Sequence, residues 1–287
     1  MVDYAGCFAW YELMTTDVAA AEAFYRNVVG WETLDASTPD LAYTLFTAGK
    51  APLAGLIDLP EAGRKQGAWP RWMGYVEVND IELTVSRIKH LGGAVYVPPT
   101  DTNIGVISVM ADPHAATFGL VKGLKAGRRQ PAESGKLGRV GWHELHAADR
   151  EKAFAFYSEV FGWQKADTEI NQTVTYQLFS AGGQTIGGMF TKLPDDPLPY
   201  WLFYFNVEDI DAAVERVTVG GGKVPEDAVD LLGGSWIARC VDPQGATFAL
   251  QGKRSHDSKL GWSTEWKGFS SRGRLLAPKR DPESTSE

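Results

Sequence analysis

The most constraining feature of this 287-residue chain is a pattern in its first half that recurs in its second half. Eight residues, several of them of rare types, are found again 132 positions later. The matched pairs are Trp10 and Trp142, Glu12 and Glu144, Leu13 and Leu145, Asp17 and Asp149, Phe24 and Phe156, Tyr25 and Tyr157, Gly30 and Gly162, and Trp31 and Trp163. So many identities at one separation indicate a duplicated domain.

The match extends along most of each half. Trp72 aligns with Trp201 at a separation of 129, and the segment from Asp112 to Leu120 aligns with Asp242 to Leu250 at a separation of 130. Separations that change by only a few residues place small insertions or deletions in loops and leave the helices and strands intact.

Each half reads twice as a strand, a helix and then three strands, which predicts an α+β fold with two βαβββ modules per half. Asp17 suits the N-cap of the first helix, and Gly30 suits its end. The expected elements of the first half are a strand at 8–16, a helix at 17–29, strands at 31–35, 43–47 and 53–58, a strand at 71–78, a helix at 81–91, and strands at 94–97, 106–110 and 117–121. The predicted organisation is a domain at 6–123, a linker at 124–137, a second domain at 138–252 and a charged tail at 253–287.

Composition and charge narrow the classes of partner. A net charge of -8 argues against a broad surface for nucleic acid or anionic membrane, because both need clustered Lys and Arg. The segment 1–7 lacks the features of a signal peptide, and no apolar run is long enough to span a membrane, so we expect a cytoplasmic protein. Cys7 and Cys240 are at non-equivalent positions, which disfavours a shared disulfide or a cysteine metal site.

The motifs W-x-E-L, A-x-x-F-Y and G-W, with the ending D-P-x-x-A-T-F-x-L, resemble the vicinal oxygen chelate superfamily of glyoxalase I, bleomycin-resistance proteins and extradiol dioxygenases. The resemblance covers both halves, so the chain as a whole resembles tandem glyoxalase-like proteins. It implies two glyoxalase-like domains, each with a curved mixed sheet around a cavity. It does not imply one activity, because this scaffold hosts many chemistries.

The resemblance also implies where a divalent metal would bind. The family's ligand positions fall on Trp10, Met73 and Gly119, and near Ala54 and Gly55, in the first half. In the second half they fall on Trp142, Leu202, Ala249 and the pair Gly187 and Gly188. These side chains are not the imidazole, carboxylate or thiolate donors that such a metal needs. We therefore predict no cofactor and no metal at the usual site, and leave open a divalent metal at a non-standard site.

Side chains alternate along a strand, so Trp10 and Glu12 should share the cavity face, as should Trp142, Glu144 and His146. The same parity predicts an aromatic-walled cavity for a small organic molecule. Its predicted ligand-binding residues are Trp10, Met73, Tyr75, Thr117, Trp142, Leu202, Tyr204, Thr247 and Gln251. Phe24, Tyr25, Phe156 and Tyr157 are expected to pack each helix onto its sheet.

Glu12, Glu144 and His146 are the candidate catalytic residues. A carboxylate inside a sheet cavity is costly unless it is paired, hydrogen-bonded or protonated, so each Glu is either a general acid or base or a structural acceptor for backbone amides or a tyrosine. His146 has no counterpart in the first half, where Met14 takes its place, and can be either a satisfied side chain or part of one active cavity.

Two classes of function remain open. One is a metal-independent binding protein for a small molecule. The other is an enzyme, either a lyase or isomerase with Glu12 or Glu144 as acid or base, or a dioxygenase or hydroxylase with a relocated metal. The modules can pair within a domain or between domains, so the chain is expected to be a monomeric pseudo-dimer or a homodimer.

Overall fold

The structure is a computed structural model that describes residues 4–65, 67–125, 135–170, 175–194, 198–230 and 235–254, with the backbone alone at 167–170. The first half contains β1 (Phe8–Thr15), α1 (Val18–Val29), β2 (Glu32–Asp35), β3 (Thr44–Ala48), β4 (Ala51–Asp58), α2 (Glu61–Lys65), β5 (Arg71–Glu77), α3 (Ile81–His90), β6 (Ala94–Asp101), β7 (Val106–Ala111) and β8 (Thr117–Lys122). The second half contains β9 (Val140–Ala147), α4 (Arg150–Phe161), β10 (Gln164–Ile170), β11 (Thr175–Ala181), β12 (Gln184–Thr191), β13 (Tyr200–Asp209), α5 (Ile210–Val219), β14 (Val229–Asp230), β15 (Trp236–Val241) and β16 (Thr247–Lys253).

Each half forms one eight-stranded mixed sheet. The strand orders are β2-β3-β4-β1-β5-β8-β7-β6 and β10-β11-β12-β9-β13-β16-β15-β14. The modules of one half join through antiparallel pairing of β1 with β5, or of β9 with β13, so the modules pair within a domain. The predicted tandem α+β fold is confirmed, although the sheets are open at their edges.

The helices begin and end where the sequence predicts. Asp17 accepts a hydrogen bond from the amide of Ala20, and Asp149 caps α4 in the same way through Glu151 and Lys152. Gly30 and Gly162 end these helices with φ of 83° and 72°, a left-handed conformation that glycine adopts without strain. The short helix α2 was not predicted.

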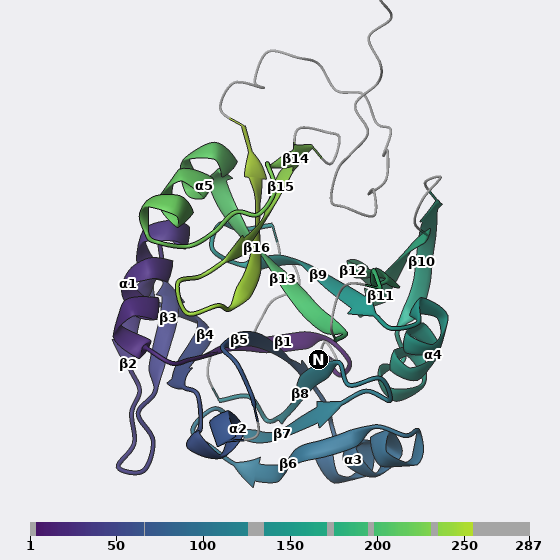
Figure 1. Cartoon of the computed structure of the whole chain (residues 1–287). Helices are drawn as coiled ribbons and strands as arrows, with labels where there is room; N and C mark the ends of the chain where they lie inside the picture. Colours follow the sequence, from purple (N-terminus) through teal and green to yellow (C-terminus); the bar gives the residue numbers. More distant parts are fainter. Residues whose placement is uncertain are drawn as a thin grey trace, which may run out of the picture.

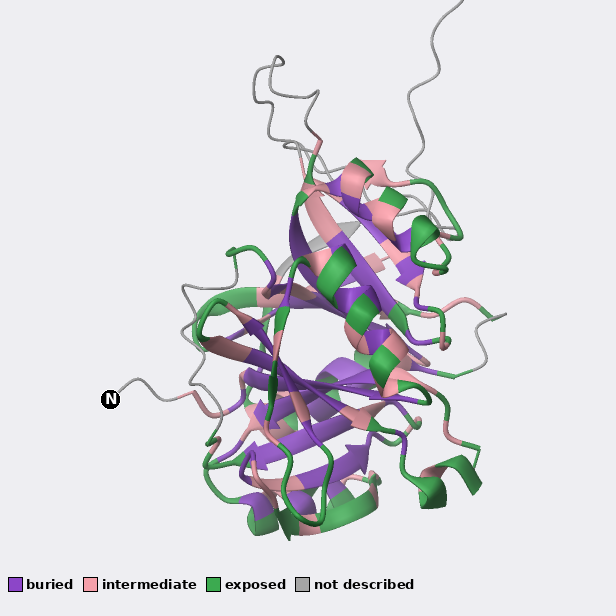
Figure 2. Cartoon of the chain, turned by 90° about the vertical axis from the view of Figure 1, so that its left-hand side faces the viewer, coloured by how far each residue is buried: buried purple, intermediate pink, exposed green. Residues whose placement is uncertain are grey.

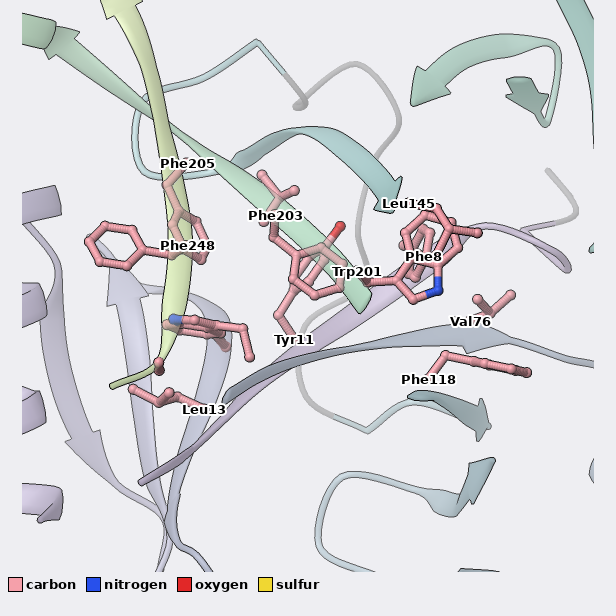
Figure 3. Packing of buried hydrophobic residues seen from close by; sticks show 14 of the residues in the cluster. Phe8, Tyr11, Leu13, Val76, Phe118, Leu145, Trp201, Phe203, Phe205 and Phe248 are labelled. Atoms are coloured by element: carbon pink, nitrogen blue, oxygen red, sulfur yellow. The ribbon is translucent and has the colours of Figure 1, made fainter. Parts of the chain in front are cut away.

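The two halves pack against each other through one shared hydrophobic core. Its buried residues come from both sheets, and Figure 3 shows Tyr11 and Leu13 facing Phe203 and Phe205 across the boundary. Helix α1 lies beside α5 at the left of Figure 1, and α3 contacts α4, where Arg87 pairs with Glu159. Most strand residues are buried, whereas the helices carry exposed outer faces (Figure 2).

The repeated Phe-Tyr and Asp-Pro motifs join the halves reciprocally. The Tyr25 hydroxyl donates to Asp242 Oδ2 over 3.0 Å, and the Tyr157 hydroxyl donates to Asp112 Oδ2 over 3.3 Å. Each tyrosine oxygen also accepts from a tryptophan of its own half, Trp72 or Trp201, within 3.2 Å. Phe24, Tyr25, Phe156 and Tyr157 pack in the core as expected, and the two tyrosines also join the halves.

The repeated Gly-Trp motif has the same double role. Trp31 Nε1 donates to the carbonyl of Gly138 over 2.9 Å, and Trp163 Nε1 donates to the carbonyl of Gly6 over 2.6 Å. Both bonds cross from one half to the other. The chain is thus an internal pseudo-dimer whose interface uses the most prominent motifs of its repeat.

Several remaining expectations concern the chain's ends and cysteines. Cys7 and Cys240 are not bonded to each other, and Cys240 is buried. The described helices include none long and apolar enough to cross a membrane. Most of the predicted linker (126–134) and most of the predicted tail (255–287) lie outside the described residues.

Candidate functional site

In the first sheet, Glu12 lies in the middle of β1 and is held by two tyrosines. Tyr43 donates to its Oε2 over 2.8 Å, and Tyr75 donates to its Oε1 over 2.9 Å. The Tyr43 oxygen in turn accepts from Trp10 Nε1 over 3.1 Å. The register places Trp10 opposite Tyr75 on β5, as the alternation of side chains predicts.

Apolar side chains close around this carboxylate. Trp10, Met73 and Tyr75 are each no more than 2% exposed. Burial raises the pKa of the Glu12 carboxyl, because desolvation disfavours its charged form more than the two tyrosine hydrogen bonds favour it. The remaining buried residues of this cluster are Ala9, Met14, Tyr43, Leu45, Leu59, Ile104, Val109 and Val121.

In the second sheet, Glu144 has the two equivalent tyrosines as hydrogen-bonding partners and two further side chains. Tyr176 donates to Oε2 and Tyr204 to Oε1, each over 3.0 Å. Arg239 Nη2 donates to Oε1 over 2.9 Å, and His146 Nε2 lies 2.9 Å from the same oxygen. Glu144 is fully buried, and all four partners converge on it.

The added partners reverse the direction of the pKa shift. Burial alone would raise the pKa of the Glu144 carboxyl, but the charge of Arg239 and the hydrogen bond from His146 outweigh burial and lower it to about 2. The Arg239 guanidinium also has a raised pKa: burial opposes its charge, and Glu144 more than compensates. Glu144 and Arg239 therefore form an ion pair that is buried at Glu144 and partly exposed at Arg239.

The face around Glu144 is more accessible than the face around Glu12. Trp142, Tyr200 and Phe190 are half-buried, and the Arg239 side chain is 29% exposed. Trp142 Nε1 donates to the Tyr176 hydroxyl over 2.9 Å, and the ring of His146 stacks on Tyr200 at 4.2 Å between centroids. Leu202, Tyr204 and Ala249 form the apolar floor.

The remaining predicted ligand-binding residues lie elsewhere. Thr117 and Thr247 line a cleft between the halves, which Met73 also reaches. Gln251 donates to Asn206 Oδ1 over 2.7 Å, beside Gly141. The structure therefore brings the predicted residues of each strand pair together but divides the full predicted set among four places.

Three residues of these clusters were missed in the sequence. Tyr43 and Tyr176 belong to a further repeat, because Tyr43, Leu45 and Phe46 recur 133 positions later. That signal identifies both tyrosines. Arg239 aligns with Val109, so the repeat cannot find it, and only a lone arginine within the strand Trp236–Val241 marks it.

Family models match each of the two halves separately, in agreement with the two sheets. A family model for a glyoxalase-like domain matches residues 10–121, and one for the Glyoxalase/Bleomycin resistance protein/Dioxygenase superfamily matches residues 139–250. The chain belongs to this superfamily. This glyoxalase-superfamily protein contains two such domains in tandem, and each is built around one of the two sheets.

Known proteins resemble parts or all of the chain. The anthracycline biosynthesis protein DauV of Streptomyces sp. (strain C5) is 32% identical over 117 residues, which are 41% of this chain and 42% of that protein. The match thus spans less than half the length of this relative. Two solved structures share the fold with TM-scores of 0.60. The Mn(II)-bound glyoxalase from Novosphingobium aromaticivorans is 15% identical and is aligned over 96% of this chain and 94% of its own. The 2,2',3-trihydroxybiphenyl 1,2-dioxygenase from Sphingomonas wittichii strain RW1 is 13% identical, over 96% and 100%.

The metal that this superfamily implies does not fit the residues at the family positions. A side chain at Gly55 or Gly188 would overlap the hydroxyl group of Tyr43 or the ring of Tyr176, and one at Gly119 would overlap the ring of Tyr75. The tyrosines that bind the two carboxylates therefore fill the space that further ligands would need. Among the described residues, no group of three or more His, Cys, Asp or Glu side chains could hold a metal ion.

Proposed function

We propose that the protein binds a small oxygenated aromatic molecule on the face of the second sheet that carries Glu144, without a metal. The observation that carries this proposal is the Glu144–Arg239 pair, which is fully hydrogen-bonded at Glu144 and partly exposed at Arg239. Glu144 fixes the guanidinium, and the exposed part of the guanidinium offers donors to an oxygen of a ligand.

The surroundings of Arg239 support an aromatic ligand. Trp142, Phe190 and Tyr200 are half-buried around the pair and supply flat apolar surface. Arginine and aromatic side chains together are typical of sites that bind a planar molecule with a few polar groups. The names of two similar proteins, one an anthracycline biosynthesis protein and one a trihydroxybiphenyl dioxygenase, refer to molecules of this kind.

Glu144 suits a positioning role better than a role as a general base. A carboxylate with a pKa of about 2 is a weak base near neutral pH, and the charge of Arg239 and the hydrogen bond from His146 are what lower it to that value. A residue that orients a charged partner needs this constant ionisation.

The binding test uses catechol and 1,8-dihydroxyanthraquinone as probes, titrated by calorimetry or by visible absorbance against protein treated with a chelator. We expect one probe molecule per chain, and we expect Arg239→Gln to weaken binding about tenfold, because one charge-assisted hydrogen bond is lost. Arg87→Gln is the matched control, because it removes another arginine–glutamate pair on the outer helices. Wild-type affinity in Arg239→Gln, or failure of both probes to bind at about 1 mM, would refute the proposal.

Elemental analysis tests the metal-independent part. Protein grown with added iron, nickel, manganese and zinc and purified without a tag should contain less than about one tenth of an equivalent of each metal. One equivalent per chain would overturn this part and would direct attention to Glu144 and His146 as ligands.

A second candidate function is acid–base catalysis by Glu12 in a lyase or isomerase. The raised pKa of its carboxyl favours this, because a general acid or base works best when its pKa approaches the working pH. Glu12→Gln would then abolish turnover of a carbonyl substrate while leaving binding in the second sheet unchanged. Retention of turnover would exclude this role.

A further inference from the structure

A cleft of about 290 Å³ lies between the two halves, and neither Glu12 nor Glu144 lines it, although Met73 of the first cluster and Tyr200 beside the second reach its wall. It is formed where β5 and β13 begin, by residues 69–73 and 198–201, which lie in equivalent segments of the repeat, together with Thr117 and Thr247. The two domains thus contribute equivalent segments to the walls of the cleft. We propose that it is a second binding site, for a small planar aromatic carboxylate, with Arg71 as the residue that binds the carboxylate.

Arg71 is the first reason for an anionic ligand. Its guanidinium makes no hydrogen bond or ion pair with any residue that the structure describes, and its Nε atom is buried. Burial lowers the pKa of this guanidinium, so its charge is held at a cost. A carboxylate in the cleft would supply the missing acceptors, and the fork of an arginine matches the two oxygens of a carboxylate.

The walls are the second reason, and they favour a flat apolar body. Trp69 is 50% exposed and Leu198 is 44% exposed, although most large apolar side chains of the described residues are buried. The Arg71 guanidinium lies 6.0 Å from the centre of the Trp69 ring. Tyr200 lines the opposite side, and its ring is held in place by stacking on His146. A volume near 290 Å³ suits a ligand with one or two rings.

The repeat itself shows that the cleft is polarised. Arg71 aligns with Tyr200, and Trp69 aligns with Leu198, so each half contributes a different side chain at equivalent positions. One end of the cleft therefore carries a cation and an indole, and the other carries a phenol and an aliphatic group. Such a site orients a ligand with a charge at one end and an apolar ring at the other.

The test measures binding of 2-naphthoate and its neutral analogue 2-naphthamide to the full chain by calorimetry. We expect one molecule of 2-naphthoate per chain, with the amide bound at least about tenfold more weakly, because it cannot form the charge-assisted pair. Arg71→Gln should remove this preference and weaken 2-naphthoate binding by a similar factor. Arg64→Gln is the matched control, since it removes a nearby exposed arginine that already pairs with Asp58.

The same titrations separate this inference from the proposed function. Arg239→Gln should leave 2-naphthoate binding unchanged, and Arg71→Gln should leave the binding of catechol and the anthraquinone unchanged. Equal affinities for the acid and the amide, or wild-type binding by Arg71→Gln, would overturn the cleft proposal. Loss of 2-naphthoate binding in Arg239→Gln alone would also overturn it, by placing the molecule on the second sheet. Because no described residue hydrogen-bonds the Arg71 guanidinium, Arg71→Gln should fold, which its melting curve checks.

Discussion

Glu12 and Glu144 occupy equivalent positions in two copies of one fold, and their hydrogen-bonding partners differ by two side chains. Glu12 accepts hydrogen bonds from Tyr43 and Tyr75 and faces Met14 and Val109 within an apolar cluster. Glu144 has the equivalent tyrosines but meets His146 and Arg239 where the first half has Met14 and Val109. The pKa of the first carboxyl is raised and that of the second is lowered to about 2. The first carboxyl thus lies in a closed apolar cluster, whereas His146 and Arg239 make the second part of a partly exposed ion pair.

The largest expected effect comes from removing the charge of each carboxylate in turn. Glu144→Gln leaves Arg239 without its counter-ion and places an amide donor among groups that donate, so it should lower the free energy of unfolding by about 3 kcal/mol. Glu12→Gln removes a charge that burial already disfavours, and should cost only about 1 kcal/mol. Urea unfolding followed by tryptophan fluorescence measures both. Equal losses in the two variants would show that Arg239 does not distinguish the sites.

The pH dependence of stability should differ in sign between the two sites. The stabilisation that Glu144 contributes is fully present above pH 4.5, the ordinary pKa of a glutamate, and is lost as the pH falls through about 2. This difference in pKa corresponds to roughly 3 kcal/mol. The Glu12 contribution is present below 4.5 and is lost as the pH rises through its raised pKa.

Unfolding free energies from about pH 2 to about pH 8 for the wild type and both glutamine variants test this difference. Glu144→Gln should flatten the curve on the acid side of 4.5, and Glu12→Gln should flatten it above 4.5. If both variants changed the same part of the curve, the two carboxylates would have similar environments in solution.

The interface between the halves offers a comparison in which the two copies should behave alike. Tyr25→Phe and Tyr157→Phe each remove a donor from a buried Asp of the other half and an acceptor from a Trp of the same half. We expect each to cost about 1 to 2 kcal/mol, because a buried partner is left unsatisfied. Tyr96→Phe, on an exposed tyrosine, is the control. Thermal melting that moved in only one of the two variants would contradict a reciprocal interface.

The sequence predicted the fold and the centre of each cluster because these follow from local rules. Strand parity was enough to bring Trp10, Glu12 and Tyr75 together, and side-chain capping was enough to start α1 at Asp17. Tyr43 was not among the predicted residues, although it recurs as Tyr176 in the second half. Arg239 could not be found by comparing the halves, since the difference between the halves is what creates its role.

The contacts between the halves lay beyond sequence reasoning for another reason. The repeat shows that Tyr25 and Tyr157 are equivalent, but it does not show that each reaches an Asp-Pro turn of the opposite domain. That depends on how two sheets dock, which is decided by the summed packing of many buried side chains, such as Phe205 on Trp72 and Phe248 on Tyr25. The cleft that contains Arg71 follows from the same docking, so it too could not be predicted.

The smallest predicted effect separates backbone conformation from packing in the two Asp-Pro turns. Asp112 accepts hydrogen bonds from the amides of His114 and Ala116, and Asp242 accepts the equivalent bonds from Gln244 and Ala246. Within these turns Ala115 has a φ of 76° and its counterpart Gly245 has a φ of 100°. A left-handed conformation costs a non-glycine residue about 1 kcal/mol, so Ala115 is strained where Gly245 is not.

Gly245→Ala should therefore lower stability by about 1 kcal/mol, although nothing lies within 4 Å of the added methyl group. Ala115→Gly should change stability by less than about 0.5 kcal/mol, because relief of strain is offset by the greater freedom of glycine in the unfolded chain. Differential scanning calorimetry on both variants measures the pair. If Gly245→Ala did not change stability, the second turn could leave the left-handed region while Asp242 keeps its hydrogen bond to Tyr25. The unfolding of the double variant Gly245→Ala and Tyr25→Phe would then show whether the interface holds the turn in place.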